Sequence, residues 1–214
     1  NYVRFFPGPR RRIRLSESDL GPRSAVIIGH TAYVANYFSD TLSIIDLNDP
    51  QAKVESVALN GAQKSSVVRK GECYFHDATI CYQGWQSCAS CHPGEGRADG
   101  LNWDLLNDGR GNPKNTKSLL LAHQTAPAMA LGVRTNAEAA VRAGIEHILF
   151  TKQPRHVAEA IDEYLKSLDP VPSPYLVRGE LSAMAQRGKA VFERAGCAAC
   201  HPPPLYTDLQ RHDV

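Results

Sequence analysis

Hydrophobic residues near the start of this 214-residue chain gather in short runs that are rich in β-branched and aromatic side chains. The runs cover residues 25–28, 31–37 and 42–46, and a Ser-Asp pair lies between the last two as a turn. Residues of these types fit the pleated, half-buried surface of a sheet. The pattern predicts a hairpin or a small antiparallel sheet within residues 1–61.

From about residue 62 the hydrophobic positions recur with the 3.6-residue period of helices. We expect helices over residues 62–77, 137–149, 154–168 and 181–195, with a clear apolar stripe on the middle two. Residues 93–115 are crowded with Gly, Asn and Asp and show no helical or strand period, so we expect a loop there. This balance of elements predicts a mainly α fold.

Composition and charge limit the classes of binding partner that we expect. The formal net charge of +2 at pH 7 gives no reason to expect nucleic acid. No stretch of the sequence reaches the apolar length of a transmembrane helix. The first residues, from Asn1 on, include neither an initiator Met nor the apolar core of a signal peptide. We therefore expect that the sequence begins inside a longer precursor.

One pentapeptide pattern, Cys-x-x-Cys-His, occurs twice and carries the chemistry of the chain. The copies are Cys88-Ala89-Ser90-Cys91-His92 and Cys197-Ala198-Ala199-Cys200-His201. In this pattern the two thiols form thioether bonds to one haem, and the adjacent imidazole is the axial ligand of the iron. The sequence therefore predicts two covalently attached c-type haems, with His92 and His201 as the proximal ligands.

Zinc binding and thiol redox chemistry are the alternatives for a Cys-x-x-Cys pair. Neither requires a His directly after the second Cys, and the two copies lie too far apart for the short loops of a zinc ribbon or finger. Two cysteines remain, Cys73 and Cys81. They fit either a disulfide or two buried free thiols.

The elements and motifs together predict three parts of the chain. Residues 1–61 form the β segment, residues 62–170 a first cytochrome c-like haem domain, and residues 171–214 a second, truncated one. The boundary between the haem domains falls at a proline-rich connector. Covalent haem attachment takes place outside the bacterial cytoplasm, where a disulfide also persists, so we expect a periplasmic, extracellular or surface-associated protein.

Several segments resemble the di-haem cytochrome c peroxidase family, which includes the methylamine-utilisation di-haem enzymes. They are Arg69-Lys70-Gly71-Glu72, Phe75-His76-Asp77, Ser87 to His92, Gly111 to Thr116, and Gly188 to Phe192. The likeness covers residues 62–214. Residues 30–46 also resemble one blade of a Tyr-Val-Thr-Asn type β-propeller. One blade cannot bury its faces alone, so we expect earlier blades or another packing partner.

The resemblance implies a peroxidase. Electrons would enter at the haem bound by His201 and pass to the haem bound by His92, where hydrogen peroxide would be reduced. A small redox protein or a quinone-linked donor would supply the electrons, and calcium lies between the haem domains of some relatives. The alternatives are a non-catalytic electron-transfer di-haem cytochrome and a haem-bearing assembly subunit.

Peroxide chemistry requires a base beside an open iron position. The resemblance points to Glu138 as that base, although the start of a helix explains a Glu there as well. His123 is a second candidate, either for catalysis or as a distal iron ligand. Met129 and His76 are further distal candidates, and each of these fits a packed or solvated residue equally.

The second haem motif departs from the family, because no Met follows His201 to act as its distal ligand. His212 is the strong ligand left on that side of the motif. We expect His212, a further chain or a missing C-terminal segment to complete this site.

Overall fold

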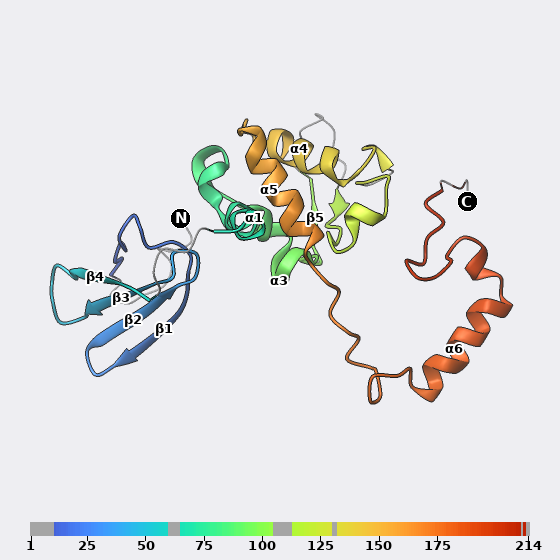
Figure 1. Ribbon diagram of the computed structural model, residues 1–214, viewed down its shortest axis with the longest axis horizontal. Helices are drawn as coiled ribbons and strands as arrows, with labels where there is room; N and C mark the ends of the chain where they lie inside the picture. Colours follow the sequence, from blue (N-terminus) through green and yellow to red (C-terminus); the bar gives the residue numbers. More distant parts are fainter. Residues whose placement is uncertain (1–10, 60–64, 105–112, 130–131, 211, 213–214) are drawn as a thin grey trace. The chain divides into compact units, whose positions relative to one another are not determined.

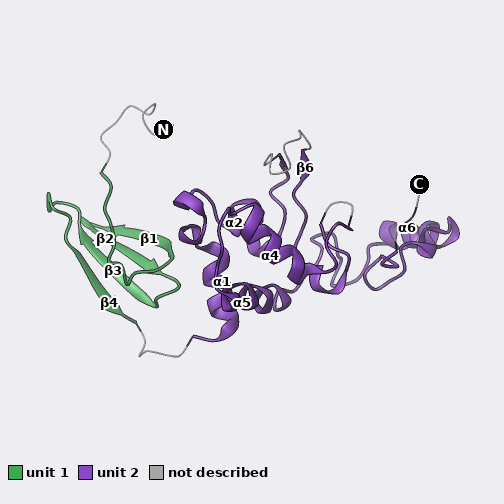
Figure 2. Cartoon of the chain, turned by 90° about the horizontal axis from the view of Figure 1, so that it is seen from above, with its two compact units in different colours: residues 1–64 green, residues 65–214 purple. Residues whose placement is uncertain are grey.

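The computed structural model describes residues 11–59, 65–104, 113–129, 132–210 and 212. The chain divides into two compact units, residues 1–64 and 65–214 (Figure 2). Among the described residues, no helix is both long and apolar enough to cross a membrane.

The first unit contains a four-stranded antiparallel sheet in which each strand pairs with the next along the chain (Figure 1). Its strands are β1 Pro22–Ile28, β2 Thr31–Asn36, β3 Thr41–Asp46 and β4 Val54–Ala58. The prediction of a mainly α fold is wrong, because helices hold 35% and strands 17% of the described residues. β4 was not predicted, because its five residues do not alternate between apolar and polar and include only two strong strand formers, Val54 and Val57.

Strand register determines what lies inside the first unit. β2 pairs with β3 so that Ala32 lies opposite Ile45, and β3 pairs with β4 so that Ile45 lies opposite Val54. Directly opposite residues share one face of a sheet. On this face Ala32 and Ile45 are buried together with Ala52 and form a small apolar core.

β1 lies at the edge of the sheet and is exposed along its whole length. Among the described strands it pairs with β2 alone. Its apolar residues Val26, Ile27 and Ile28 are 54%, 62% and 65% exposed, and since neighbours in a strand alternate, both faces of β1 are uncovered.

Asp19 is a buried carboxylate at the polar end of the same sheet face. The hydroxyls of Thr41 and Ser56 donate to its Oδ1, each at 2.6 Å, and the hydroxyl of Ser43 donates to its Oδ2 at 2.7 Å. Burial alone would raise the pKa of Asp19, but the hydrogen bonds from Ser56, Thr41 and Ser43 outweigh it and hold the pKa below its ordinary value. The ionised carboxylate therefore ties β3 and β4 to the segment before β1.

The lowered pKa of Asp19 predicts how the first unit responds to acid. A depressed folded pKa contributes stability above the ordinary value of 3.8, and that stability is lost as the pH falls through the folded pKa. We expect Asp19→Asn to remove this loss and to lower the unfolding free energy at neutral pH by about 1–3 kcal/mol, because an amide NH₂ meets hydroxyl donors.

Urea unfolding at neutral and acidic pH measures both effects. Asp46→Asn is the matched control, since Asp46 is an exposed β3 carboxylate that accepts the backbone N–H of Asn48. Equal acid sensitivity in Asp19→Asn and the wild type would contradict the assignment.

The second unit consists of helices and short connecting elements. Its α-helices are α1 Val67–His76, α2 Cys88–Cys91, α3 Pro93–Gly96, α4 Ala137–His147, α5 Arg155–Lys166 and α6 Ala183–Arg194. Its 3₁₀ helices include η2 Ala78–Ile80, η3 Tyr82–Gly84, η4 Ala122–Gln124 and η6 Cys197–Ala199. Strands β5 Asn102–Trp103 and β6 Lys114–Asn115 form a two-stranded antiparallel pair.

Two parts of this unit differ from the predictions for local reasons. The helix expected over residues 62–77 begins at Val67, because the Oγ of Ser66 caps it by accepting the N–H of Arg69 at 3.1 Å. Residues 62–64 lie outside the described residues, as do residues 105–112 of the expected loop. The rest of that loop contains α3 and the β5–β6 pair, and Trp103 Nε1 fixes it by donating to Asp99 at 2.7 Å.

α1 and α5 cross in close contact at Gly71, and this crossing holds the core of the second unit. A Cβ atom on Gly71 would lie 1.9 Å from the carbonyl oxygen of Ala160, so the helices approach this closely only with glycine there. The rings of Phe75 and Tyr164 pack beside the crossing with centroids 5.3 Å apart. The buried cluster consists of Phe75, Cys81, Ile145, Leu149, Val157, Ala158, Ile161, Tyr164 and Leu165.

α6 has a similar glycine in a different setting. None of its described residues is buried, and Met184 is 74% exposed. A Cβ atom on Gly188 would meet no atom within 4 Å. Gly188 therefore carries no packing constraint of the kind that Gly71 carries.

These two glycines form a matched pair for a test of the α1–α5 crossing. We expect Gly71→Ala to lower the unfolding free energy by about 3 kcal/mol, because the new methyl overlaps the α5 backbone. Gly188→Ala should be neutral or raise it by up to about 1 kcal/mol, since alanine favours the helix. Urea unfolding followed by far-UV circular dichroism measures both, and equal effects of the two substitutions would contradict the close crossing.

Candidate functional site

Each Cys-x-x-Cys-His motif forms one helical turn that closes at its histidine. In the first motif the turn is α2, and the backbone N–H of His92 donates to the carbonyl of Cys88 at 2.9 Å. In the second motif the turn is η6, and the N–H of His201 donates to the carbonyl of Cys197 at 3.0 Å. Each motif thus places two cysteines and a histidine on a single turn.

The first motif is anchored to the core of the second unit. The backbone N–H of Ser87 donates to the Oγ of Ser90 at 3.0 Å, which fixes the start of α2. The buried side chain of Gln86 donates through Nε2 to the carbonyl of Ile148 at 2.9 Å, just after α4. Cys88 packs against the buried cluster at the α1–α5 crossing.

The surroundings of the first motif favour neutral side chains. Burial raises the pKa of the Cys88 thiol to about 12. Burial also lowers the pKa of His92, although backbone groups of Lys117 and Arg97 act in the opposite direction. A thioether sulfur and an iron-bound imidazole are both neutral, whereas a zinc site requires thiolates.

His201 in the second motif is oriented as an axial ligand needs to be. Its Nδ1 lies 3.0 Å from the carbonyl oxygen of Tyr206. Because a carbonyl only accepts, Nδ1 carries the proton and Nε2 keeps its lone pair for a metal. Cys197, Cys200 and His201 are all exposed, so this motif is open to solvent.

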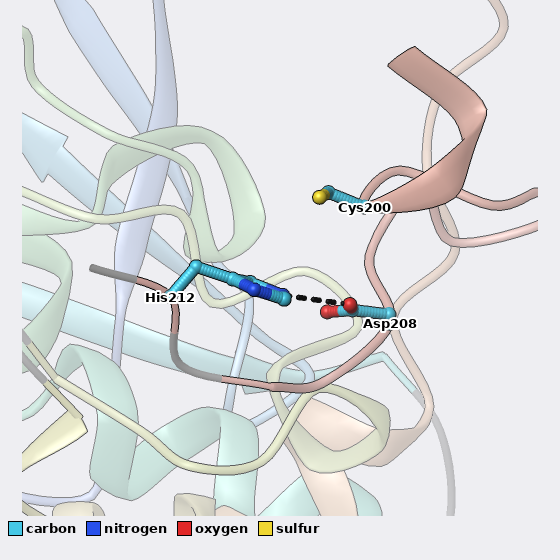
Figure 3. Close-up of side chains that lie close together, drawn as sticks. All are labelled: Cys200, Asp208 and His212. Atoms are coloured by element: carbon cyan, nitrogen blue, oxygen red, sulfur yellow. Dashed lines mark hydrogen bonds and ion pairs between the residues drawn. The ribbon is translucent and has the colours of Figure 1, made fainter. Parts of the chain in front are cut away.

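Figure 3 shows a further group near the second motif, made of Cys200, Asp208 and His212, whose ligand atoms all lie within 4.8 Å of one another. His212 Nε2 and Asp208 Oδ2 are 2.8 Å apart. The backbone N–H of Gln210 lowers the pKa of Asp208, and the hydrogen bond from His212 adds to this. Since the ionised carboxylate only accepts, His212 Nε2 donates to it and is not a free ligand atom in this arrangement.

His123 and Glu138, the two candidates for catalysis, are linked through Asp162 and Arg142. His123 on η4 and Asp162 on α5 have side chains that are 7% and 4% exposed, with His123 Nε2 at 3.4 Å from Asp162 Oδ1. Arg142 on α4 forms an ion pair with the other carboxylate oxygen of Asp162 and donates to the carbonyl of Glu138 at 2.9 Å. His123 Nδ1 is buried with no partner among the described residues.

The carboxylate of Glu138 is held by the start of α4 and by a lysine. Its own backbone N–H lowers its pKa most, and His123 and Lys166 lower it further. Lys166 Nζ lies 3.4 Å from Glu138 Oε1. These contacts stabilise the ionised form and match the alternative explanation of Glu138 as a helix-start residue, while its catalytic role remains a prediction.

The contacts of the remaining predicted residues give no sign of a ligand role. Met129 is 40% exposed, and His76 Nδ1 lies 2.9 Å from the carbonyl of Glu72 in the preceding turn of α1. Cys73 is half-buried and Cys81 is a buried member of the core, and both have free thiols in the structure. The choice between a disulfide and two free thiols stays a prediction.

Asp162 was not predicted as a site residue, although the sequence contains a signal for it. Asp162 follows Ala158 by four residues and precedes Leu165 by three, which places it on the apolar stripe of α5. A carboxylate at such a position is rarely buried without a partner. Its partners could not be read from the sequence, because His123 and Arg142 come from other elements.

Comparison with known proteins adds one clear relative. The chain is 33% identical over 172 residues to hydrazine synthase subunit gamma of Kuenenia stuttgartiensis, a match that covers 71% of this chain and 48% of that subunit. A solved structure of hydrazine synthase from the same organism, pressurised with xenon, matches with a TM-score of 0.62 at 30% identity, over 72% of this chain and 55% of that one. The chain therefore spans about half the length of the curated relative it matches.

A weaker likeness is to a MauG-like protein associated with microbial copper homeostasis, at 18% identity and a TM-score of 0.49 over 74% of this chain and 56% of that chain. No family model matches the chain. The main result of the comparisons is therefore the similarity to the hydrazine synthase gamma subunit.

Proposed function

We propose that the chain is a redox protein with two covalently attached c-type haems. Cys88 and Cys91 would hold the first haem, and Cys197 and Cys200 the second. The observation that carries this proposal is the shared geometry of the motifs, in which the histidine N–H closes a helical turn on the first cysteine at 2.9 and 3.0 Å. His92 and His201 would then be the axial ligands.

The surroundings of the two motifs suggest different roles for the two haem sites. Haem supplies one-electron redox chemistry at its iron. The buried first motif would exclude water and set the polarity around its haem, whereas the exposed second motif would be accessible to an electron donor. In this proposal each motif has its own haem domain, a first over residues 62–170 and a second over 171–214.

Peroxide reduction at the first haem is the reaction that we favour. It is supported by the resemblance to di-haem cytochrome c peroxidases and by a buried cluster of acid–base groups in the first domain, including His123 and Asp162. Electrons from a small redox protein or a quinone-linked donor would enter at the second haem. Because haem is attached covalently outside the cytoplasm, we place the protein in the periplasm or at the cell surface.

A second candidate function rests on the sequence match. Since the relative is a subunit of hydrazine synthase, this chain would on that view be one subunit of a multi-chain redox enzyme. Its haems would then pass electrons to or from a partner chain and would not reduce peroxide.

Haem attachment is tested by intact mass and pyridine haemochrome spectra after expression in the periplasm of a host that matures c-type cytochromes. We expect the wild type to carry the mass of two haems, because each motif offers two thiols for thioether bonds. A Cys88→Ala/Cys91→Ala variant and a Cys197→Ala/Cys200→Ala variant should each carry one. Cys73→Ala, outside both motifs, should keep two. A bare polypeptide of the correct mass would reject the proposal.

Electron spin resonance and stopped-flow mixing with hydrogen peroxide separate the two functions. A peroxidase needs a high-spin iron, at least in the half-reduced protein, and oxidation of the reduced haems by peroxide. We expect the first haem to show both properties, and the Cys197→Ala/Cys200→Ala variant to lose rapid electron supply to it. Two low-spin irons and no reaction with peroxide would favour the electron-transfer subunit.

A further inference from the structure

His123 has one ring nitrogen engaged and the other buried without a partner. Nε2 lies 3.4 Å from Asp162 Oδ1, while Nδ1 is buried and unpaired among the described residues. The imidazole side chain is 7% exposed. A buried polar atom without a partner costs free energy, and in a folded protein it points to a bound ligand or a catalytic role.

The partners of Asp162 define which nitrogen carries the proton. Arg142 forms an ion pair with Asp162 Oδ2, and both oxygens of an ion-paired carboxylate act only as acceptors. Nε2 of His123 must therefore donate to Oδ1. In the neutral imidazole this leaves Nδ1 as a bare lone pair.

The segment that carries His123 is hydrogen-bonded to the chain just after the first haem motif. The backbone N–H of Leu119 donates to the carbonyl of Gly96 at 2.7 Å, and Ala122 N–H, at the start of η4, donates back to Leu119 at 3.1 Å. Gly96 follows His92 by four residues. The turn that carries His123 is thus tied to the chain directly after the proximal histidine.

Resting on the proposed function, we propose that His123 Nδ1 is the proton acceptor for the ligand of the first haem, and that Asp162 and Arg142 are its positioning residues. A ligand X–H transfers its proton to Nδ1, giving X⁻ and an imidazolium. The imidazolium keeps the hydrogen bond from its Nε2–H to Asp162, whose negative charge stabilises it, and its Nδ1–H can return the proton to the ligand. No electron is transferred in this step.

The geometry favours a base over an iron ligand. Nδ1 adjoins the ring carbon that carries Cβ, so coordination through it would press the backbone against a porphyrin, and the less crowded Nε2 is turned to Asp162. Glu138 is the less suitable base, because its carboxylate already meets its own backbone N–H and Lys166.

The test uses the haem-loaded protein with carbon monoxide and hydrogen peroxide as probes. His123→Gln removes the base at similar volume, Asp162→Asn removes the positioning charge, and Glu159→Gln is the control, since Glu159 is a carboxylate on α5 that pairs with Arg155 at the surface. We expect a loss of about 100-fold or more in the peroxide reaction rate for His123→Gln and of about 10- to 100-fold for Asp162→Asn. The control should match the wild type.

Infrared spectra of the reduced carbon monoxide complex report on the group that faces the ligand, independently of turnover. The C–O stretch should shift in His123→Gln and in Asp162→Asn and stay unchanged in Glu159→Gln. Nitrogen-15 spectra of the same diamagnetic complex should show His123 protonated at Nε2. These readouts keep the proposal testable with His123→Gln alone, should Asp162→Asn not fold.

Three results would overturn the proposal. An unchanged C–O stretch and peroxide rate in His123→Gln would place His123 away from the ligand. A change of iron spin state in the ferric His123→Gln protein would make His123 an iron ligand. Nitrogen-15 spectra that showed His123 protonated at Nδ1 would mean that Nδ1 has no lone pair to accept a proton. Each differs from failure of the proposed function, in which the wild-type mass shows no haem at all.

Discussion

The close crossing of α1 and α5 at Gly71 is the contact on which the second unit depends. The same helix that receives Gly71 at Ala160 carries Tyr164 against Phe75 and Asp162 toward His123. Because a helix is rigid over so few residues, these positions move together. The packing of α5 on α1 and the orientation of the His123 imidazole therefore depend on each other. A methyl group on Gly71 that displaced α5 would disturb both.

Among the described residues, each unit buries one carboxylate, and the two have different hydrogen-bonding partners. Asp19 accepts hydroxyl groups from the strands, which neutralise no charge but complete its hydrogen bonding. Asp162 has a guanidinium and an imidazole as partners. The hydroxyl groups around Asp19 do not ionise near neutral pH and only hold the sheet together. The His123 imidazole, with Asp162 at one ring nitrogen and no partner at the other, can take up and release a proton. Function is therefore expected in the second unit.

Local signals in the sequence accounted for most elements but not for their partners. The apolar stripe over residues 154–168 predicts α5, and the Cys-x-x-Cys-His spacing leads to the turns that His92 and His201 close. The start of α1 was placed too early, since periodicity does not reveal which serine caps a helix. The mainly α assignment failed because β4 and the β5–β6 pair are short. Asp162 was missed because its role depends on residues that are close in space and distant in sequence.

β1 gives the amino-terminal sheet a character that matters for handling the molecule. Its outer edge presents backbone N–H and C=O groups to whatever strand arrives, and Val26, Ile27 and Ile28 add apolar surface on both sides of that edge. Such an edge is a template for β-augmentation and for the growth of fibrils. At high concentration, self-association of the chain is accordingly expected to involve this edge strand, far in sequence from either cysteine motif.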